Sequence, residues 1–126
     1  MLKHSKAFTT YSTGNMDTAK DFYEEILGLN THKNNMGLLE LQLNNCSVLI
    51  YPKKDHQPAA YTVLNFYVAN IQEMVELLNK KGVEFEKFEG SLKTDSQGIH
   101  RGEVGPAMAW FKDPSGNILS LIQNEE

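Results

Sequence analysis

One order of elements occurs twice along this chain and constrains its fold more than any other feature. Each copy begins with a stretch rich in aromatic and β-branched residues, Lys6–Ser12 and Tyr61–Val68, which predicts a β-strand. An asparagine follows in each copy, Asn15 or Asn70, where the N-cap of a helix is expected. Apolar residues then recur at helical spacing, and a glycine ends each predicted helix. The chain is therefore predicted to contain two copies of one structural module.

Three further strands are expected after each predicted helix. They are a weak strand within Asn30–Gly37, then Leu38–Leu43 and Ser47–Tyr51 in the first copy, and Val83–Phe88, Trp110–Phe111 and Ile118–Ile122 in the second. Both copies thus have the order β-α-β-β-β, with Phe8 aligned to Val63. One copy alone cannot bury both its helix and its sheet, so the two are expected to pack as a single α+β domain over residues 1–126. The modules cover roughly residues 3–57 and 58–126.

The final hairpin is the most specific part of the pattern. Its two apolar strands flank the turn Asp-Pro-Ser-Gly-Asn at residues 113–117. Pro114 fixes φ, Gly116 can adopt a positive φ, and the side chains of Asp113 and Asn117 can bond back to the backbone. The sequence therefore predicts a β-hairpin with a defined turn at the end of the domain.

Composition excludes several classes of function. Twelve basic and sixteen acidic residues give a net charge of −4, which argues against nucleic acid as a partner. No apolar run approaches the roughly 18 residues of a membrane span, and the first residues lack the apolar core of a signal peptide. The single cysteine, Cys46, is expected to be a buried apolar residue, and it fits a reducing compartment such as the cytoplasm.

Two segments resemble one known family. They are Asp17–Gly28 (DTAKDFYEEILG) and Phe111–Gln123 (FKDPSGNILSLIQ), and both are similar to the glyoxalase/bleomycin-resistance/dioxygenase superfamily, also called vicinal oxygen chelate. The resemblance implies one cupped mixed sheet with the helices outside it. It also implies homodimers, which are common among short members of the family. The family's fold supports many activities, so the resemblance alone specifies none.

The resemblance also implies four metal positions, normally occupied by His or Glu. Aligned on the motifs, these positions fall on Phe8, Ile50, Val63 and Ser120. Only Ser120 has a polar side-chain atom, and a lone hydroxyl is a poor ligand for the metals concerned. We therefore predict that the usual metal site is absent and that no cofactor is bound.

The inner face of the cup is the expected ligand site. Strand alternation places on this face, as predicted ligand-binding residues, Phe8, Thr10, Ile50, Val63, Asn65, Tyr67 and Ser120. Asn65 is the most informative of them, because a buried amide within a strand needs a hydrogen-bond partner. Apolar walls with few polar groups are typical of small-molecule pockets. The alternative is that the cup is filled by its own side chains.

A long loop is predicted between residues 89 and 106. Loops of this length often form lids, so Arg101 or Lys93 is expected to meet an anionic ligand over the cup. A solvated excursion or a dimer contact is the alternative. Trp110 follows the loop and is expected either to form an aromatic wall of the pocket or to lie in the core.

Three functions are compatible with these observations. The first is a metal-free protein of bleomycin-resistance type that binds a small molecule in the cup. The second is an enzyme of the superfamily, a lyase or dioxygenase, with a non-standard site. The third is a structural or interaction module with a filled cup. We favour the first, since metal polarisation of the substrate drives the usual chemistry, and no catalytic residue is predicted.

Overall fold

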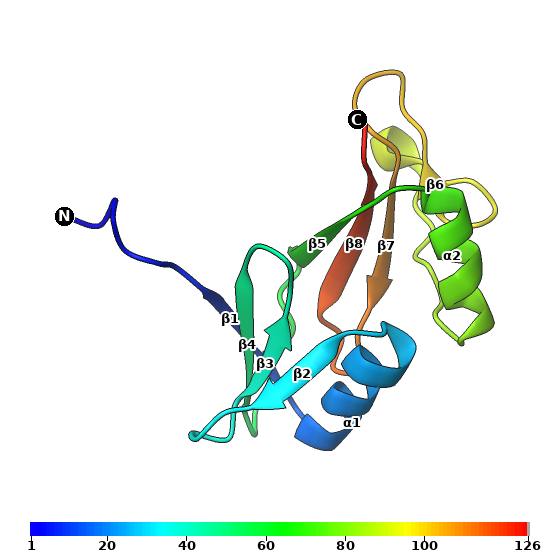
Figure 1. Ribbon diagram of the computed structural model, residues 1–126. Helices are drawn as coiled ribbons and strands as arrows, with labels where there is room; N and C mark the ends of the chain where they lie inside the picture. The colour runs from blue at the N-terminus through cyan, green and yellow to red at the C-terminus, as the bar shows by residue number, and fades with distance from the viewer. Residues whose placement is uncertain (126) are drawn as a thin grey trace. The chain divides into compact units, whose positions relative to one another are not determined.

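The computed structural model describes residues 1–125, and the chain forms two compact units, Met1–Gln57 and Pro58–Glu126. Unit 1 contains β1 (Thr9–Thr13), α1 (Met16–Asp21), the π-helical turn η1 (Phe22–Ile26), β2 (Asn30–Lys33), β3 (Leu39–Gln42) and β4 (Ser47–Pro52) (Figure 1). Unit 2 contains β5 (Thr62–Val68), α2 (Ile71–Lys80), the 3-10 turn η2 (Gly90–Leu92), β6 (Ile99–His100), β7 (Met108–Lys112) and β8 (Ile118–Gln123).

The two units have the same topology. The strand order is β1-β4-β3-β2 in unit 1 and β5-β8-β7-β6 in unit 2. In each sheet the first strand pairs in parallel with the last, and the remaining pairs are antiparallel. The predicted α+β class and the repeated β-α-β-β-β order are therefore confirmed. The cup that would join the sheets stays a prediction.

Both helices begin as the sequence predicts. The Asn15 side chain accepts a hydrogen bond from the Thr18 backbone N–H at 3.0 Å, and the Asn70 side chain accepts one from the Glu73 N–H at 3.1 Å. Each bond satisfies a backbone donor that the first helical turn leaves unpaired. The first helix differs from the expected regular one, because after Asp21 it continues as the π-helical turn η1.

The final hairpin forms around its predicted turn. One carboxylate oxygen of Asp113 accepts from the backbone N–H groups of Ser115 and Asn117, and the other accepts from the Asn117 side-chain amide, each at 2.9 Å. Gly116 has a φ of 85°, a conformation that other residues rarely adopt. Asp113 and Asn117 are both buried, so this polar network holds the turn within the core.

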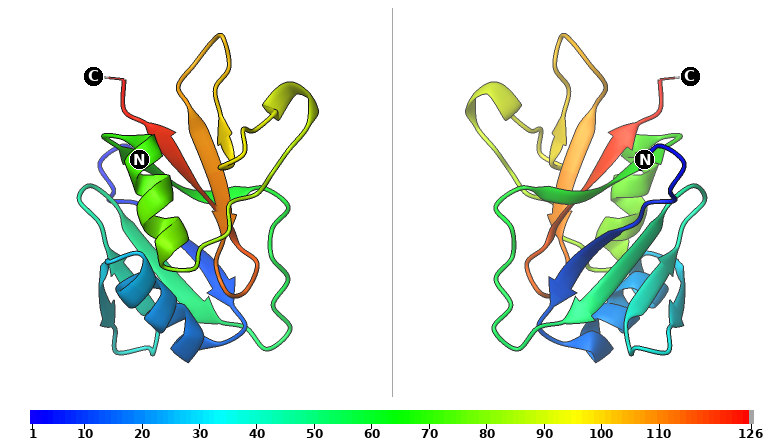
Figure 2. Two further views of the ribbon diagram at one scale, coloured as in Figure 1. Left: turned by 90° about the vertical axis from the view of Figure 1, so that its right-hand side faces the viewer. Right: turned by 90° about the vertical axis from the view of Figure 1, so that its left-hand side faces the viewer.

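Three expectations are wrong in detail. Val83–Phe88 is not a strand; it contacts β7 through side chains, and its β-pairing with β7 is an isolated bridge between Phe85 and Phe111. The second strand of unit 2 is instead β6, a two-residue strand inside the segment predicted as a loop (Figure 2, yellow to orange). Cys46 is exposed rather than buried, because it lies in the turn between β3 and β4 and not within β4.

None of the helices within residues 1–125 has the length and apolar character that crossing a bilayer requires.

Candidate functional site

The face of the unit 2 sheet that points away from α2 carries four of the predicted site residues, Asn65, Tyr67, Trp110 and Ser120. Paired residues on neighbouring strands point to the same side of a sheet. The register joins Asn65, Ser120 and Trp110 into one row across β5, β8 and β7. The adjacent row is Tyr67, Ile122, Met108 and His100. We call these seven residues the Asn65 face.

A hydrogen bond within this face orients the Asn65 amide. The Ser120 hydroxyl donates to Asn65 Oδ1. Ser120 is 0% exposed, whereas Asn65 is exposed. Within residues 1–125 the Asn65 Nδ2 group has no hydrogen-bond partner in the protein. The pair therefore presents an amide donor, fixed by a buried hydroxyl, on an otherwise largely apolar surface.

Aromatic rings surround the polar pair. The Trp110 ring packs edge to face against Phe88, with centroids 5.4 Å apart, and lies 6.3 Å from the His100 ring. This packing leaves Trp110 only 7% exposed, so it contributes both to the core and to the wall of the face. Tyr67, by contrast, is 78% exposed and available for contact. The face thus combines a covered indole with an open phenol ring.

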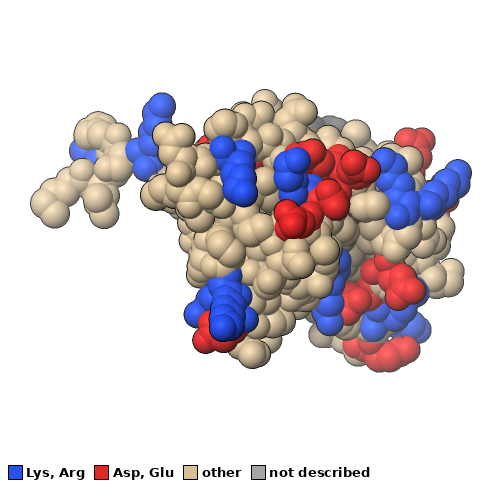
Figure 3. All heavy atoms as spheres, turned by 90° about the horizontal axis from the view of Figure 1, so that it is seen from below, with Lys and Arg blue, Asp and Glu red and all other residues tan. Residues whose placement is uncertain are grey.

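The Asn65 face contains no Asp, Glu, Lys or Arg. Along β7, the next residue on the same side of the sheet as Met108 and Trp110 is the charged Lys112, at the end of the strand. Its ammonium lies 3.5 Å from the Glu86 carboxylate. Elsewhere, on the surface seen in Figure 3, acidic and basic side chains lie next to each other in small groups. The electrostatics of the face therefore favour an uncharged ligand.

Unit 1 also has a face that points away from its helix, but Ile50 is not part of it. Tyr11 lies on the α1 side, since its hydroxyl donates to the Tyr23 hydroxyl of η1 at 2.8 Å. The register pairs Tyr11 with Ile50 and Thr10 with Leu49. Ile50 is accordingly buried on the helix side, and the prediction that it shares a face with Thr10 is wrong by one residue.

The open face of unit 1 carries a row that the sequence analysis did not identify. Thr10, Leu49, Glu40 and His32 follow one another across β1, β4, β3 and β2. The imidazole of His32 therefore lies on the same face as the carboxylate of Glu40, on the neighbouring strand. The alternation of side chains along β3 and β2 could have indicated that Glu40 and His32 share a face. However, β2 is too short and polar for its register to be predicted from sequence.

The remaining predicted residues lie outside the two open rows. Phe8 precedes β1 and is 63% exposed. Val63 falls at a register shift in β5, between Thr62 and Leu64, and is half-buried. Their contacts with a ligand, like that of Thr10, stay predictions.

Arg101 is not brought to the Asn65 face. Its Nη2 donates to the side-chain oxygen of Gln72 on α2 at 2.8 Å, and its Nε lies 3.8 Å from an Asp95 carboxylate oxygen. Arg101 is therefore held on the α2 side of the sheet. A lid in which this guanidinium covers the Asn65 face is not the arrangement observed.

The side chains at the family's four metal positions do not fit a metal ion. Phe8 and Val63 are hydrocarbon, and so is the remaining unit 1 position, whether it is Ile50 or, by register, Leu49. The Ser120 hydroxyl already donates to Asn65. In the part of the chain that the structure describes, neither unit places three His, Cys, Asp or Glu side chains together as a metal-binding group. We therefore derive no chemistry through a metal.

The comparisons with known proteins identify the family. The profile of the Glyoxalase/Bleomycin resistance protein/Dioxygenase superfamily matches residues 7–121, so the chain belongs to this superfamily. No curated protein sequence matches the chain significantly.

Solved structures agree on the fold. A glyoxalase-family protein from Bacillus anthracis has a TM-score of 0.76 at 19% identity, covering 99% of this chain and 100% of that one. Lactoylglutathione lyase from Agrobacterium tumefaciens has a TM-score of 0.71 at 16% identity, covering 96% and 95%. An antibiotic-binding protein from a Streptomyces species has a TM-score of 0.68 at 19% identity, covering 97% and 98%. At these identities the likeness shows the fold alone.

Proposed function

We propose that this protein binds a small, uncharged organic molecule at the Asn65 face, without a resident metal at the family's usual positions. One observation carries the proposal. The Asn65 amide is held by buried Ser120, and its N–H donors have no protein partner within residues 1–125. A fixed polar group on an aromatic and aliphatic surface is the usual composition of a small-molecule site.

The geometry suggests how such a ligand would be held. Asn65 Nδ2 would donate to a carbonyl or ether oxygen of the ligand. The open ring of Tyr67 would stack on a planar group, and Ile122 and Met108 would provide apolar contact. Because no fixed charge belongs to the face, a neutral planar ligand with one acceptor fits best.

Family membership and two relatives in fold support this reading. One is the antibiotic-binding protein from Streptomyces, and the other is a fosfomycin resistance protein from Listeria monocytogenes. The first binds an antibiotic and the second is named for resistance to one, and these functions on the same fold support a small-molecule ligand for this chain.

A thermal-shift screen of neutral aromatic compounds tests the proposal. A ligand present at 100 times its Kd should stabilise the protein by about 2.7 kcal/mol. Asn65→Ala should weaken that ligand about tenfold, the equivalent of one hydrogen bond. Asn79→Ala, which removes an exposed amide from α2, is the matched control and should bind normally. A ligand that binds Asn65→Ala as well as wild type, or a screen with no hit, would favour the filled-cup alternative.

Metal analysis tests the second half of the proposal. Protein purified after exposure to nickel, zinc, iron and manganese should retain well under one ion per chain, because the aligned positions provide no suitable donor set. None of these ions should raise the melting temperature. A stoichiometric, tightly held metal would overturn the metal-free reading.

A second candidate, an enzyme of the same superfamily with a non-standard site, is favoured by the row containing His32 and Glu40. The two residues pair across β2 and β3, and an imidazole or a carboxylate on an open face can act as a general base. If a ligand from the screen is turned over, His32→Ala and Glu40→Gln should each reduce the turnover without changing the melting temperature by more than a few degrees. Turnover that is unaffected by both substitutions would place the chemistry elsewhere.

We further propose a homodimer in a reducing compartment such as the cytoplasm. Support comes from the aromatic residues on or near the unpaired edges of β1 and β5: Phe8, Tyr61 and Tyr67 are each at least 63% exposed. Sedimentation velocity should show a dimer that Tyr61→Ser weakens. A monomer at all concentrations would contradict the proposal.

A further inference from the structure

A second feature lies at the β6 edge of the unit 2 sheet. It is a hollow of about 270 Å³, lined by Lys93, Thr94, Asp95, Ile99, His100 and Arg101. Ile99 and Arg101 alternate onto the α2 side of the sheet, so the hollow is distinct from the Asn65 face, with which it shares only His100. Its size suits a small anionic group rather than a drug-sized molecule.

Asp95 organises the walls of this hollow. Its carboxylate accepts from the backbone N–H groups of Gln97 and Ile99, each at 2.9 Å. Its own N–H donates to the Ile99 carbonyl at 2.8 Å. These bonds close a tight turn and hold the segment with Lys93 beside the segment with His100 and Arg101.

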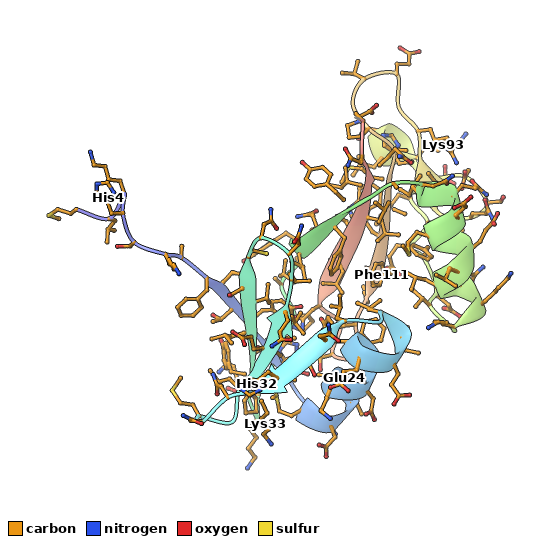
Figure 4. All side chains as sticks on the ribbon, viewed as in Figure 1. His4, Glu24, His32, Lys33, Lys93 and Phe111 are labelled. Atoms are coloured by element: carbon orange, nitrogen blue, oxygen red, sulfur yellow. The ribbon has the colours of Figure 1, made fainter. Side chains whose placement is uncertain are left out.

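The three basic side chains differ in how they are held. Gln72 and Asp95 together fix the plane of the Arg101 guanidinium, which leaves further N–H donors free to bind. His100 Nδ1 donates to the Lys93 carbonyl at 2.9 Å, which fixes the imidazole ring. Within residues 1–125 the Lys93 ammonium has no hydrogen-bond or ion-pair partner. Figure 4 labels Lys93 near the start of α2.

We propose that this hollow binds a phosphate group, either free phosphate or a small phosphate monoester. Lys93 and Arg101 carry two positive charges against the single negative charge of Asp95, so the lining is net positive before His100 is counted. A guanidinium held in one plane matches the oxygens of a phosphate, and a mobile ammonium adds a point charge. The other charged residues of unit 2 carry a net negative charge, which the lining of this hollow does not share.

The test is an NMR titration of the full chain with inorganic phosphate, compared with chloride at equal ionic strength. We expect saturable amide shifts at residues 93–101 that chloride does not produce. Lys93→Gln should weaken phosphate about tenfold, as should Arg101→Gln. Lys80→Gln removes the same charge from an exposed position on α2 and should bind as wild type. Tighter binding of phenyl phosphate than of inorganic phosphate would identify an ester as the natural group, and equal binding would identify the free ion.

Two results would overturn this site. One is the absence of any shift beyond the effect of chloride. The other is unchanged affinity in both Lys93→Gln and Arg101→Gln, with the two variants giving wild-type spectra elsewhere. Neither result bears on ligand binding at the Asn65 face, which the Asn65→Ala screen tests separately.

Discussion

Ser120 combines complete burial with a polar side chain, and its hydroxyl is committed to one partner, Asn65. Ser120→Ala should lower the free energy of unfolding by about 1 kcal/mol, because it removes one hydrogen bond made by a fully buried side chain. Urea denaturation at neutral pH measures the change. Ser96→Ala, in an exposed turn, should be neutral, and a loss of equal size there would contradict the assignment.

Replacing Ser120 by glutamate, the acid that the family resemblance implies at this position, should lower the free energy of unfolding far more. Ser120→Glu would place a carboxylate where the side chain is fully buried, which costs several kcal/mol unless a partner neutralises it. If this variant instead folds as stably as wild type and retains a metal, the position was already organised for a ligand ion, contrary to our reading.

The carboxyl group of Glu24 makes the stability of unit 1 depend on pH. The hydrogen bond from Thr31 lowers the pKa of Glu24 below its ordinary value, and Lys20 adds a smaller effect in the same direction. A lowered pKa means stability that is complete above the ordinary carboxyl range and is lost as the pH falls through the folded pKa. In Thr31→Val the Glu24 pKa, followed by NMR, should rise toward its ordinary value. Lys20→Gln should raise it less, and the reverse order would contradict the assigned causes.

At the scale of elements, the 113–117 turn should be the most sensitive part of unit 2. Asp113→Ala removes the acceptor for three buried or half-buried N–H donors. We expect a loss of about 3 kcal/mol in the free energy of unfolding, measured by urea denaturation. Asp95→Ala also removes an acceptor of two backbone N–H groups, but Asp95 is exposed, so water can replace it and the loss should be under half as large. Equal losses of unfolding free energy in Asp113→Ala and Asp95→Ala would show that the burial of the carboxylate does not determine the size of the loss.

The elements also show which features could be predicted from sequence. Both N-caps and the final turn were predictable because short-range chemistry specifies them. The face of Ile50 was not, because the run Val48–Tyr51 is apolar on both sides and its alternation carries no polar marker. The β6 strand was missed because a two-residue strand gives no periodic signal, and a long-range pairing with β7 forms it.

The site was predictable only in part for the same reason. Asn65, Tyr67, Ser120 and Trp110 meet on one face because β5, β7 and β8 alternate regularly. Arg101 could not be placed, since its position depends on Gln72, a helix residue far away in sequence. Loop residues are positioned by such contacts rather than by local pattern.

Because the two units have the same topology, equivalent substitutions can be made in each unit to test whether the whole molecule unfolds cooperatively. Asn15→Ala and Asn70→Ala each remove an N-cap, which costs about 1 kcal/mol. If the chain is one cooperative domain, as predicted, each should lower the same single calorimetric transition by roughly 3–5 °C. Asn15→Ser and Asn70→Ser retain the cap and should restore most of the loss. Two transitions, each moved by only one substitution, would show that the units unfold independently.

The strand order of unit 2 also bears on how the protein is made. Within residues 1–125, the only sheet partner of β5 is β8, which comprises residues 118–123, and β8 also separates β5 from β7. During synthesis β5 therefore remains unpaired, with its apolar side chains exposed, until β8 has emerged. By then nearly all of residues 58–123 have left the ribosome. Unit 1 can complete its sheet once β4 has emerged. A chain truncated after β7 would lack β8 and would leave the edge of β5 unpaired. Chains with an unpaired strand edge are the kind of species that chaperones and proteases recognise.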